Sequence, residues 1–151
     1  MQYWLMKSEP DVFSINDLKQ KKTTLWDGVR NYQARNFMTT TMQLGDMVLF
    51  YHSNAEPPGI AGLAKISRLA QPDPLQFDKK SEYYDPKATI KTPRWFGVTV
   101  EFMQKFNKII SLDELRNHKS LQSMLVIKKG QRLSIQPVSK AEFDVIYKLA
   151  H

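Results

Sequence analysis

The most unusual stretch of the sequence reads WDGVRNYQARN from Trp26 onwards. It combines an indole and a carboxylate, Trp26 and Asp27, with the amide of Asn31 and two arginines. A planar nucleobase needs an aromatic surface to stack on and amide or carboxylate groups for its edge. The stretch therefore predicts a base-binding pocket, with Arg30 and Arg35 on phosphate near a helix N-terminus. The alternative is that Trp26 belongs to the core and the arginines pair with neighbouring acids.

Two further polar segments directly follow apolar runs that are typical of buried strands. One comes after residues 3–6 and the other closes residues 46–51. Side chains at the end of a strand leave the core and can face a ligand, and Pro10 stiffens the first segment. The alternative is two ordinary loops. The candidate pocket residues from these segments are Lys7, Ser8, Glu9, Tyr51, His52 and Ser53.

Aromatic side chains also lie in or beside a proline-rich stretch in the middle of the chain. The sequence reads YYDP at residues 83–86 and PRW at residues 93–95. Loop aromatics are candidates for the wall of a pocket, although they can equally form a local cluster that holds the loop in place. We choose Tyr84 and Trp95 as candidates for a second aromatic wall.

Catalytic and metal-binding interpretations find little support in the sequence. Ser8 and His52 with an aspartate have the residue types of a hydrolase triad, but no G-x-S-x-G motif accompanies them. The three histidines have no metal-ligand spacing, and the acidic pair Asp113-Glu114 is explained by helix capping. We therefore predict no catalytic residue, no metal and no cofactor.

Composition narrows the class of protein further. The chain has 151 residues, 42% of them hydrophobic and 25% charged, which is one domain's worth of an ordinary globular protein. The absence of cysteine excludes disulfides and thiolate metal sites. No apolar run is long enough to span a bilayer, and the N-terminus is no secretory signal. We expect a soluble protein, cytoplasmic in a bacterium or nuclear in a eukaryote.

The charge balance favours a polyanionic partner. The net charge is +7, and the basic excess is concentrated in the second half of the chain. Residues 1–75 carry 8 Lys and Arg against 7 Asp and Glu, whereas residues 76–151 carry 14 against 8. Basicity of this size fits binding to nucleic acid, although it also fits a solvated surface that binds nothing specific.

Periodicity and turn signals outline the elements that must position these side chains. Extended segments are expected at residues 3–6, 23–26, 46–51, 60–69, 96–102 and 132–138. Helices are expected to begin near Ser14, Asn31, Ser111 and Ser139, and the latter two open capping boxes with Glu114 and Glu142. Neighbouring strands are joined by short turns, so we predict an α+β fold with five or six mostly antiparallel strands.

The sequence resembles a known family along nearly its whole length. The motifs that carry the resemblance are YWLMKSEP at 3–10, WDGVRNYQARN at 26–36, FYHS at 50–53, YYDP at 83–86, PRW at 93–95 and RLSIQPV at 132–138. In this order they are similar to an EVE domain. The resemblance implies one domain spanning residues 1–151. It also implies a PUA-like fold, a small bent β-barrel with helices packed around it.

The resemblance also implies a function. EVE domains are related to YTH domains, which hold a methylated base in an aromatic cage, and are regarded as readers of modified bases. Positions 7–9 and 26–27 resemble the pocket segments of YTH domains. We therefore expect a non-catalytic reader of a modified base, with 5-methylcytosine in DNA as the leading target and RNA as an alternative.

Two other classes of function stay open at this point. One is an enzyme that acts on a nucleoside or on RNA, with Glu9 or Asp27 as general base. The other is a small-molecule binding protein that uses the same pocket. The expected partner is nucleic acid rather than a membrane, and the expected state is a monomer.

Overall fold

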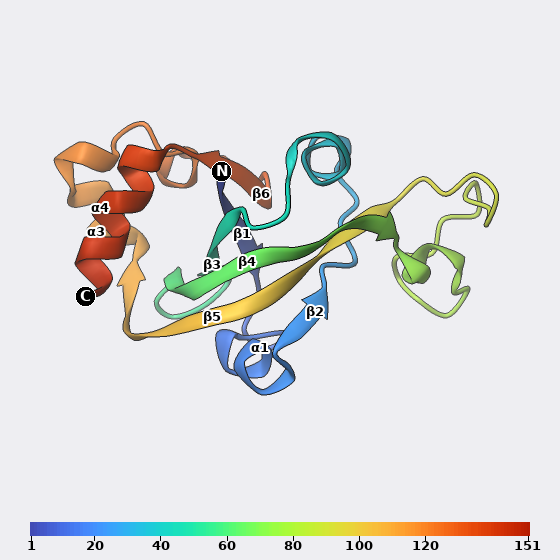
Figure 1. Cartoon of the computed structure of the whole chain (residues 1–151), viewed down its shortest axis with the longest axis horizontal. Coiled ribbons are helices and arrows are strands. Elements are labelled where there is room, and N and C mark those ends of the chain that lie inside the picture. Colours follow the sequence, from blue (N-terminus) through green and yellow to red (C-terminus); the bar gives the residue numbers. More distant parts are fainter.

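The computed structural model describes residues 1–151 (Figure 1). Six strands, four α-helices and four short helical turns follow one another along the chain. Their bounds are β1 (Tyr3–Ser8), α1 (Ile15–Lys21), β2 (Thr23–Leu25), α2 (Tyr32–Asn36), η1 (Phe37–Thr41), β3 (Met47–His52), β4 (Gly59–Pro72), η2 (Pro74–Phe77), β5 (Phe96–Ser111), α3 (Leu112–Asn117), η3 (Lys119–Leu121), η4 (Leu125–Ile127), β6 (Ile135–Val138) and α4 (Lys140–Ala150).

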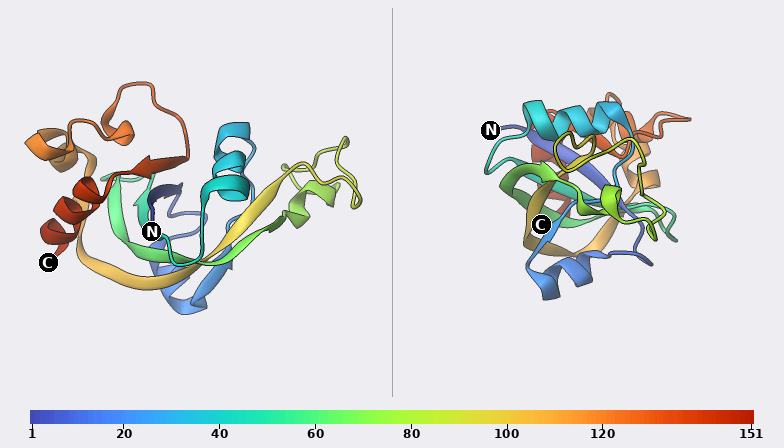
Figure 2. Two further views of the ribbon diagram at one scale, coloured as in Figure 1. Left: turned by 45° about the horizontal axis from the view of Figure 1, so that its top comes forward. Right: turned by 90° about the vertical axis from the view of Figure 1, so that its right-hand side faces the viewer.

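The strands form one sheet in the order β2-β5-β4-β3-β1-β6. All neighbouring pairs are antiparallel except β1 and β3, which run parallel. The predicted α+β class with mostly antiparallel strands is therefore confirmed. The edge strands β2 and β6 do not pair, so the expected barrel is an open, strongly bent sheet (Figure 2).

The two longest strands, β4 and β5, form the curved spine of the molecule (Figures 1 and 2). Their pairing shifts register at four places, which bends the ribbon. At one of them a side chain at Gly62 would place its Cβ 2.3 Å from the carbonyl oxygen of Gln104, so only glycine fits. Beyond the spine, residues 73–95 project from one end of the molecule (Figure 1).

Helix ends follow the sequence signals closely. Ser14, Ser111 and Ser139 each accept a hydrogen bond from the backbone three residues later, and each forms a reciprocal capping box. Asn31 caps α2 through its side-chain oxygen, which accepts from the Ala34 N–H at 2.9 Å. The longest helix has 11 residues, and none is both long and apolar enough to cross a membrane.

Alternating side chains of the strands divide the core into two clusters. Trp4 and Phe50 belong to the larger cluster, which also contains Trp26. Leu5 and Tyr51 belong to the other, which packs under α3 and α4. Strand residues therefore alternate between the clusters with the period of two that a pleated strand imposes. We call the first the open cluster, because it ends at a pocket described below, and the second the closed cluster.

Most expected elements are present, with differences at two strands. The strand expected to end at Phe102 continues to Ser111, because the register shifts of its pairing with β4 interrupt the apolar alternation there. The strand expected over residues 132–138 begins only at Ile135. The antiparallel pairing expected between residues 46–51 and 60–69 is confirmed as β3 with β4.

Candidate nucleobase pocket

The parallel pairing of β1 with β3 brings two of the expected site segments together. Ser8 lies opposite His52 in the register, so both strands leave the sheet at the same edge. The Ser53 N–H donates to the Ser8 carbonyl at 3.0 Å, which ties the two exits to each other. The chain before β6 lies on the other side of β1, where the Lys7 N–H donates to the Ser134 carbonyl at 2.9 Å.

The Trp26 segment reaches the same edge from β2. Its backbone N–H donates to the Val98 carbonyl at 2.7 Å, and a Cβ at Gly97 would lie 2.3 Å from the Trp26 carbonyl oxygen. The indole packs edge-on against Phe50, with ring centroids 5.6 Å apart, and remains 8% exposed. Trp26 is therefore a core residue of the open cluster and also lines the pocket. The two roles that the sequence offered for it, core residue and pocket wall, do not exclude each other.

A buried carboxylate fixes the turn after Trp26. Gly28 has φ of +77°, a conformation that glycine adopts without strain. Its N–H donates to Asp73 Oδ2 at 2.8 Å, and Arg30 Nη1 donates to the same oxygen at 3.0 Å. Asp73 is fully buried, and its other oxygen accepts from the Leu75 N–H at 2.8 Å. The base of the long loop thus anchors the segment that presents Trp26 and Asp27.

Together these elements enclose a pocket of about 900 Å³, which we call the Trp26 pocket. Four of its side chains are cationic, two are carboxylates and six are hydrophobic. Its lining residues are Lys7, Ser8, Glu9, Val12, Phe13, Lys21, Thr24, Leu25, Trp26, Asp27, Gly28, Val29, Arg30, Ser53, Asn54, Tyr83, Gln131, Arg132 and Ser134. A pocket of this size and mixed lining can hold a nucleobase with its sugar.

The Asp27 carboxyl is the most distinctive acid of the pocket. Its hydrogen bond is with its own backbone rather than with another residue. Burial, and then the negative charge of Asp73, raises its pKa above the ordinary aspartate value. A carboxyl group with a raised pKa in a pocket is a candidate binding or catalytic group.

The other polar groups of the pocket differ in how far they are already engaged. The Ser8 hydroxyl donates to the Phe13 carbonyl at 2.6 Å, and Glu9 Oε1 accepts from the Asn54 side-chain amide. Burial lowers the pKa of Lys7, whose ammonium has one long hydrogen bond, 3.5 Å to the Gln131 carbonyl. Lys7 therefore has unused donor capacity in the pocket.

The structure brings seven of the thirteen predicted site residues into the Trp26 pocket and places the other six elsewhere. Those in the pocket are Lys7, Ser8, Glu9, Trp26, Asp27, Arg30 and Ser53. Three of the six others come from the N-terminus of α2 and from β3. Asn31 caps α2, Tyr51 is buried in the closed cluster, and the His52 Nε2 accepts from the Ile15 N–H at 3.1 Å. Burial lowers the pKa of His52, which keeps this acceptor neutral.

Besides Trp26 and Phe13, the aromatic side chain that lines the pocket is Tyr83, not Tyr84 or Trp95. Tyr83 lies against Gly28, where an added Cβ would be 3.2 Å from its ring. Trp95 is buried outside the pocket, stacks on Tyr32 with centroids 5.0 Å apart, and donates from Nε1 to Asp85 at 2.8 Å. Residues 83–95 therefore contribute one aromatic wall and a local cluster behind it.

Both arginines predicted to contact phosphate already have protein acceptors. Arg30 donates to Asp73 and to the Tyr83 carbonyl at 2.8 Å. Arg35 donates to the Arg94 carbonyl at 3.0 Å and to the side chain of Asn36 at 2.9 Å. Phosphate contact by either arginine stays a prediction.

Sequence reasoning overlooked the lining contributed by the Lys21–Leu25 region and by residues 131–134. The latter are separated from Lys7 by more than 120 positions and reach it only because β6 pairs with β1. No local pattern reveals such a pairing, although the quoted RLSIQPV motif contains two of the lining residues, Arg132 and Ser134. No three His, Asp or Glu side chains gather as metal ligands in the structure.

Comparison with known proteins places the chain among well-defined relatives. The family model described as "EVE domain" matches residues 2–149. Human thymocyte nuclear protein 1 is 46% identical over 97% of this chain and 73% of its own length. A solved structure of human THYN1 protein in complex with 5-methylcytosine-containing DNA has a TM-score of 0.92 and 46% identity, covering 100% of this chain and 98% of that one.

A protein from Leishmania major gives a similar result. Its structure has a TM-score of 0.94 and 49% identity, and the match covers 99% of this chain and 94% of that one. The resemblance stated from the motifs is thereby confirmed along the whole chain. This chain belongs to the EVE domain family.

Proposed function

We propose that this protein is a non-catalytic reader that binds a modified cytosine of nucleic acid in the Trp26 pocket. The observation that carries the proposal is the convergence of an indole, a free carboxyl and an ammonium group in one pocket of a chain that is 46% identical to a relative solved with 5-methylcytosine-containing DNA. We further propose that residues 1–151 act as one EVE domain, which the match over residues 2–149 supports.

The pocket offers groups for both the face and the edge of a cytosine. Stacking on an aromatic side chain such as Trp26 contributes about 1–3 kcal/mol per base. This offsets the few kcal/mol, on the order of one stacking step, that flipping the base out of a duplex costs. The Asp27 carboxyl can accept from the exocyclic amine, and Lys7 can donate to the O2 carbonyl.

A contact between the Asp27 carboxyl and the hydrogen-bonding edge of cytosine requires a proton. Cytosine N3 and an ionised carboxylate are both acceptors, so a contact that uses N3 and the amine together needs one proton between them. The raised pKa of Asp27 makes a neutral carboxyl available at higher pH than for an ordinary aspartate. Binding through this contact therefore takes up a proton, and affinity falls as the pH rises.

Recognition of the methyl group uses the apolar part of the lining. Six hydrophobic side chains border the pocket, among them Val12, Phe13 and Val29. Burying one methyl carbon is worth about 0.8 kcal/mol, roughly a fourfold change in affinity. We therefore expect modest rather than absolute preference for a methylated base.

The test is equilibrium binding to labelled oligonucleotides that differ at one base. Matched strands carry cytosine, 5-methylcytosine, 5-hydroxymethylcytosine or N6-methyladenine, each as DNA and as RNA, at two salt concentrations. We expect tighter binding to a modified cytosine, retained at the higher salt. Equal, salt-sensitive binding to every strand would show that the pocket serves another ligand.

A second candidate function follows from the same carboxyl group. A pocket acid with a raised pKa also suits a general base, so an enzyme acting on a nucleoside or RNA is the alternative. Turnover of a nucleoside and oligonucleotide panel that is lost in Asp27→Asn or Glu9→Gln would support the enzyme. Base-selective binding without turnover would support the reader.

A further inference from the structure

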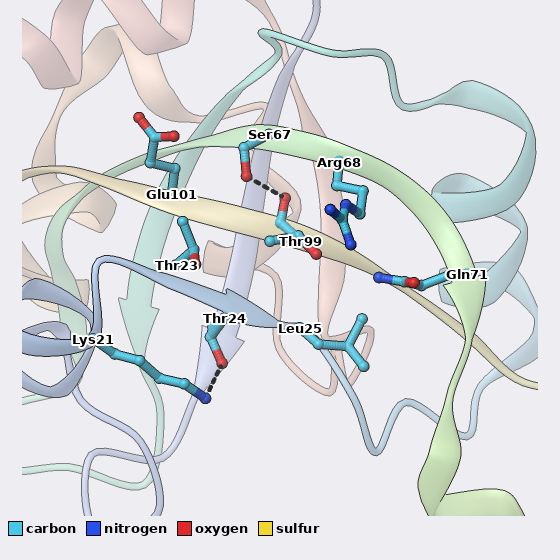
Figure 3. Close-up of a pocket in the computed structure, with 9 residues that line it drawn as sticks. All are labelled: Lys21, Thr23, Thr24, Leu25, Ser67, Arg68, Gln71, Thr99 and Glu101. Atoms are coloured by element: carbon cyan, nitrogen blue, oxygen red, sulfur yellow. Dashed lines mark hydrogen bonds between the residues drawn. The ribbon is translucent and has the colours of Figure 1, made fainter.

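A second hollow of about 550 Å³ lies beside the Trp26 pocket, across strands β2, β5 and β4 (Figure 3). We call it the β2 groove. Its nine lining residues are Lys21, Thr23, Thr24, Leu25, Ser67, Arg68, Gln71, Thr99 and Glu101. Only one of them, Leu25, is hydrophobic, so the groove is not suited to an apolar ligand.

The β2 groove adjoins the Trp26 pocket. Lys21, Thr24 and Leu25 line both. Lys21 ends α1, and Thr24 and Leu25 belong to the edge strand β2, immediately before Trp26 in the chain. A polymer with one unit in the pocket can therefore reach the groove across these three shared residues.

The lining of the groove has the chemistry of a backbone-binding surface. Hydroxyls of Thr23, Thr24 and Ser67 accompany the amide of Gln71 and two cationic groups. Hydroxyl, amide and cationic side chains are the groups that most often contact phosphates and sugars in protein–nucleic acid complexes. Contacts to phosphates and sugars do not distinguish one base from another, and the groove has no aromatic side chain on which a base could stack.

Arg68 is the free cation of the groove. It has no ion pair and no side-chain hydrogen bond in the structure, whereas Arg30 and Arg35 are both held by protein acceptors. Figure 3 shows Arg68 and Gln71 extending toward one another over β5. The one carboxylate of the groove, Glu101, is paired with Lys65 at 3.5 Å. The positive charge of Arg68 is therefore available to a ligand.

We propose that the β2 groove binds the sugar–phosphate backbone next to the flipped base, with Arg68 as its principal phosphate contact. This inference rests on the proposed function, because it places the remainder of the same strand. It replaces the sequence-based expectation of a phosphate contact by Arg30 or Arg35 with a guanidinium that needs no rearrangement. The main chain of Arg68 is paired with Thr99, so its side chain starts from the sheet.

The experiment compares Arg68→Gln with Lys148→Gln, which removes the same charge from an exposed position on α4 at the opposite end of the molecule (Figure 1). The probes are a short single-stranded DNA with one central 5-methylcytosine, the same strand with cytosine, and the free nucleoside 5-methyl-2′-deoxycytidine. Affinity for each strand is measured across a series of salt concentrations.

We expect Arg68→Gln to weaken both strands equally, several-fold at low salt, and to lower the slope of log K against log salt by about 0.7, the value for one phosphate of a single strand. The ratio between the two strands and the affinity for the nucleoside should not change, and Lys148→Gln should resemble the wild type. An effect of Arg68→Gln no larger than that of Lys148→Gln would overturn the proposal, as would a change confined to the methylated strand. Failure of the reader itself would appear separately, as a wild-type protein without preference between the strands.

Discussion

The two core clusters are built from the same strands, yet one is sealed and the other ends in a pocket. The closed cluster lies beneath α3 and α4 and contains fully buried aliphatic residues such as Leu115 and Ile146. The open cluster contains Trp4, Phe50 and Trp26, and polar strand ends border it. Both faces of the sheet therefore bury a hydrophobic core, but only the open face also borders the binding pocket.

The difference in helix cover explains why the pocket opens to solvent beside the open cluster and not beside the closed cluster. Helices need only bury an apolar stripe, and α4 does so with Phe143 and Ile146 on the closed cluster. On the open side no helix of comparable length covers the ends of β1 and β3, and a loop anchored by Asp73 positions the Trp26 segment instead. The comparison predicts that substitutions on the two sides will affect stability and binding differently.

The largest expected effect is on stability and comes from the closed cluster. Leu115→Ala removes a fully buried side chain, and substitutions of this kind cost about 2–5 kcal/mol. Urea unfolding should show this loss, while the affinity for a 5-methylcytosine strand, measured below the melting temperature, should stay within twofold. A large loss of affinity in the folded variant would show that the clusters are coupled.

A smaller loss of stability with a clear loss of affinity is expected from Asp73→Asn. The amide keeps one acceptor but sets an N–H₂ group against donors of Gly28, Arg30 or Leu75. An unsatisfied buried group costs about 1–3 kcal/mol, and the Trp26 segment loses its anchor. Unfolding and binding should both worsen, whereas Asp144→Asn, which breaks an exposed ion pair on α4, should change neither appreciably.

The open side should also make stability sensitive to acid through His52. Its pKa is lowered by burial, so the unfolded chain binds a proton more readily than the folded chain does. The associated stability is present above the ordinary histidine pKa of about 6.5 and is lost as the pH falls below it. His52→Gln keeps an acceptor for the Ile15 N–H without titrating, so its melting temperature should decline less over the same range. Equal declines would assign the acid sensitivity to other groups.

The smallest effect on stability, and the most specific effect on binding, is expected at Asp27. In the wild type, affinity for a 5-methylcytosine strand should fall as the pH rises, because the contact with N3 requires a proton. An asparagine amide donates to N3 and accepts from the amine without titrating. Asp27→Asn should therefore bind with a flatter pH profile, and a profile identical to that of the wild type would exclude Asp27 from the contact.

The fold was largely predictable because its signals are local. Three reciprocal serine caps, the turn before β3 and the alternation at the start of β5 each depend on residues a few positions apart. The continuation of β5 to Ser111 was not predictable, because bulges in its pairing with β4 remove the period of two. The parallel pair of β1 and β3 likewise leaves no local trace.

Pocket residues were predictable from the sequence only where unusual residue types occur together in a short segment. Trp26, Asp27 and the residues after β1 carry unusual chemistry in a short segment and do line the pocket. Tyr51 was a candidate for its type, but the alternation of β3 turns it to the closed cluster. Tyr83 and Arg132 enter through tertiary contacts of a long loop and of β6, and their neighbours Tyr84 and Trp95 look equally suitable in the sequence.

The three indole N–H groups allow the central claim to be tested in one titration. The indole N–H groups of Trp4 and Trp95 donate to Asp46 and Asp85, whereas that of Trp26, a residue that lines the pocket, has no partner in the structure. Nitrogen-15 labelled protein, with the Trp26 signal assigned by Trp26→Phe, is titrated with a 5-methylcytosine strand and with the matched cytosine strand. The account predicts that the Trp26 indole signal shifts most, at lower concentrations of the methylated strand, while that of Trp4 stays in place. Saturation with a Trp26 signal that does not move would contradict it.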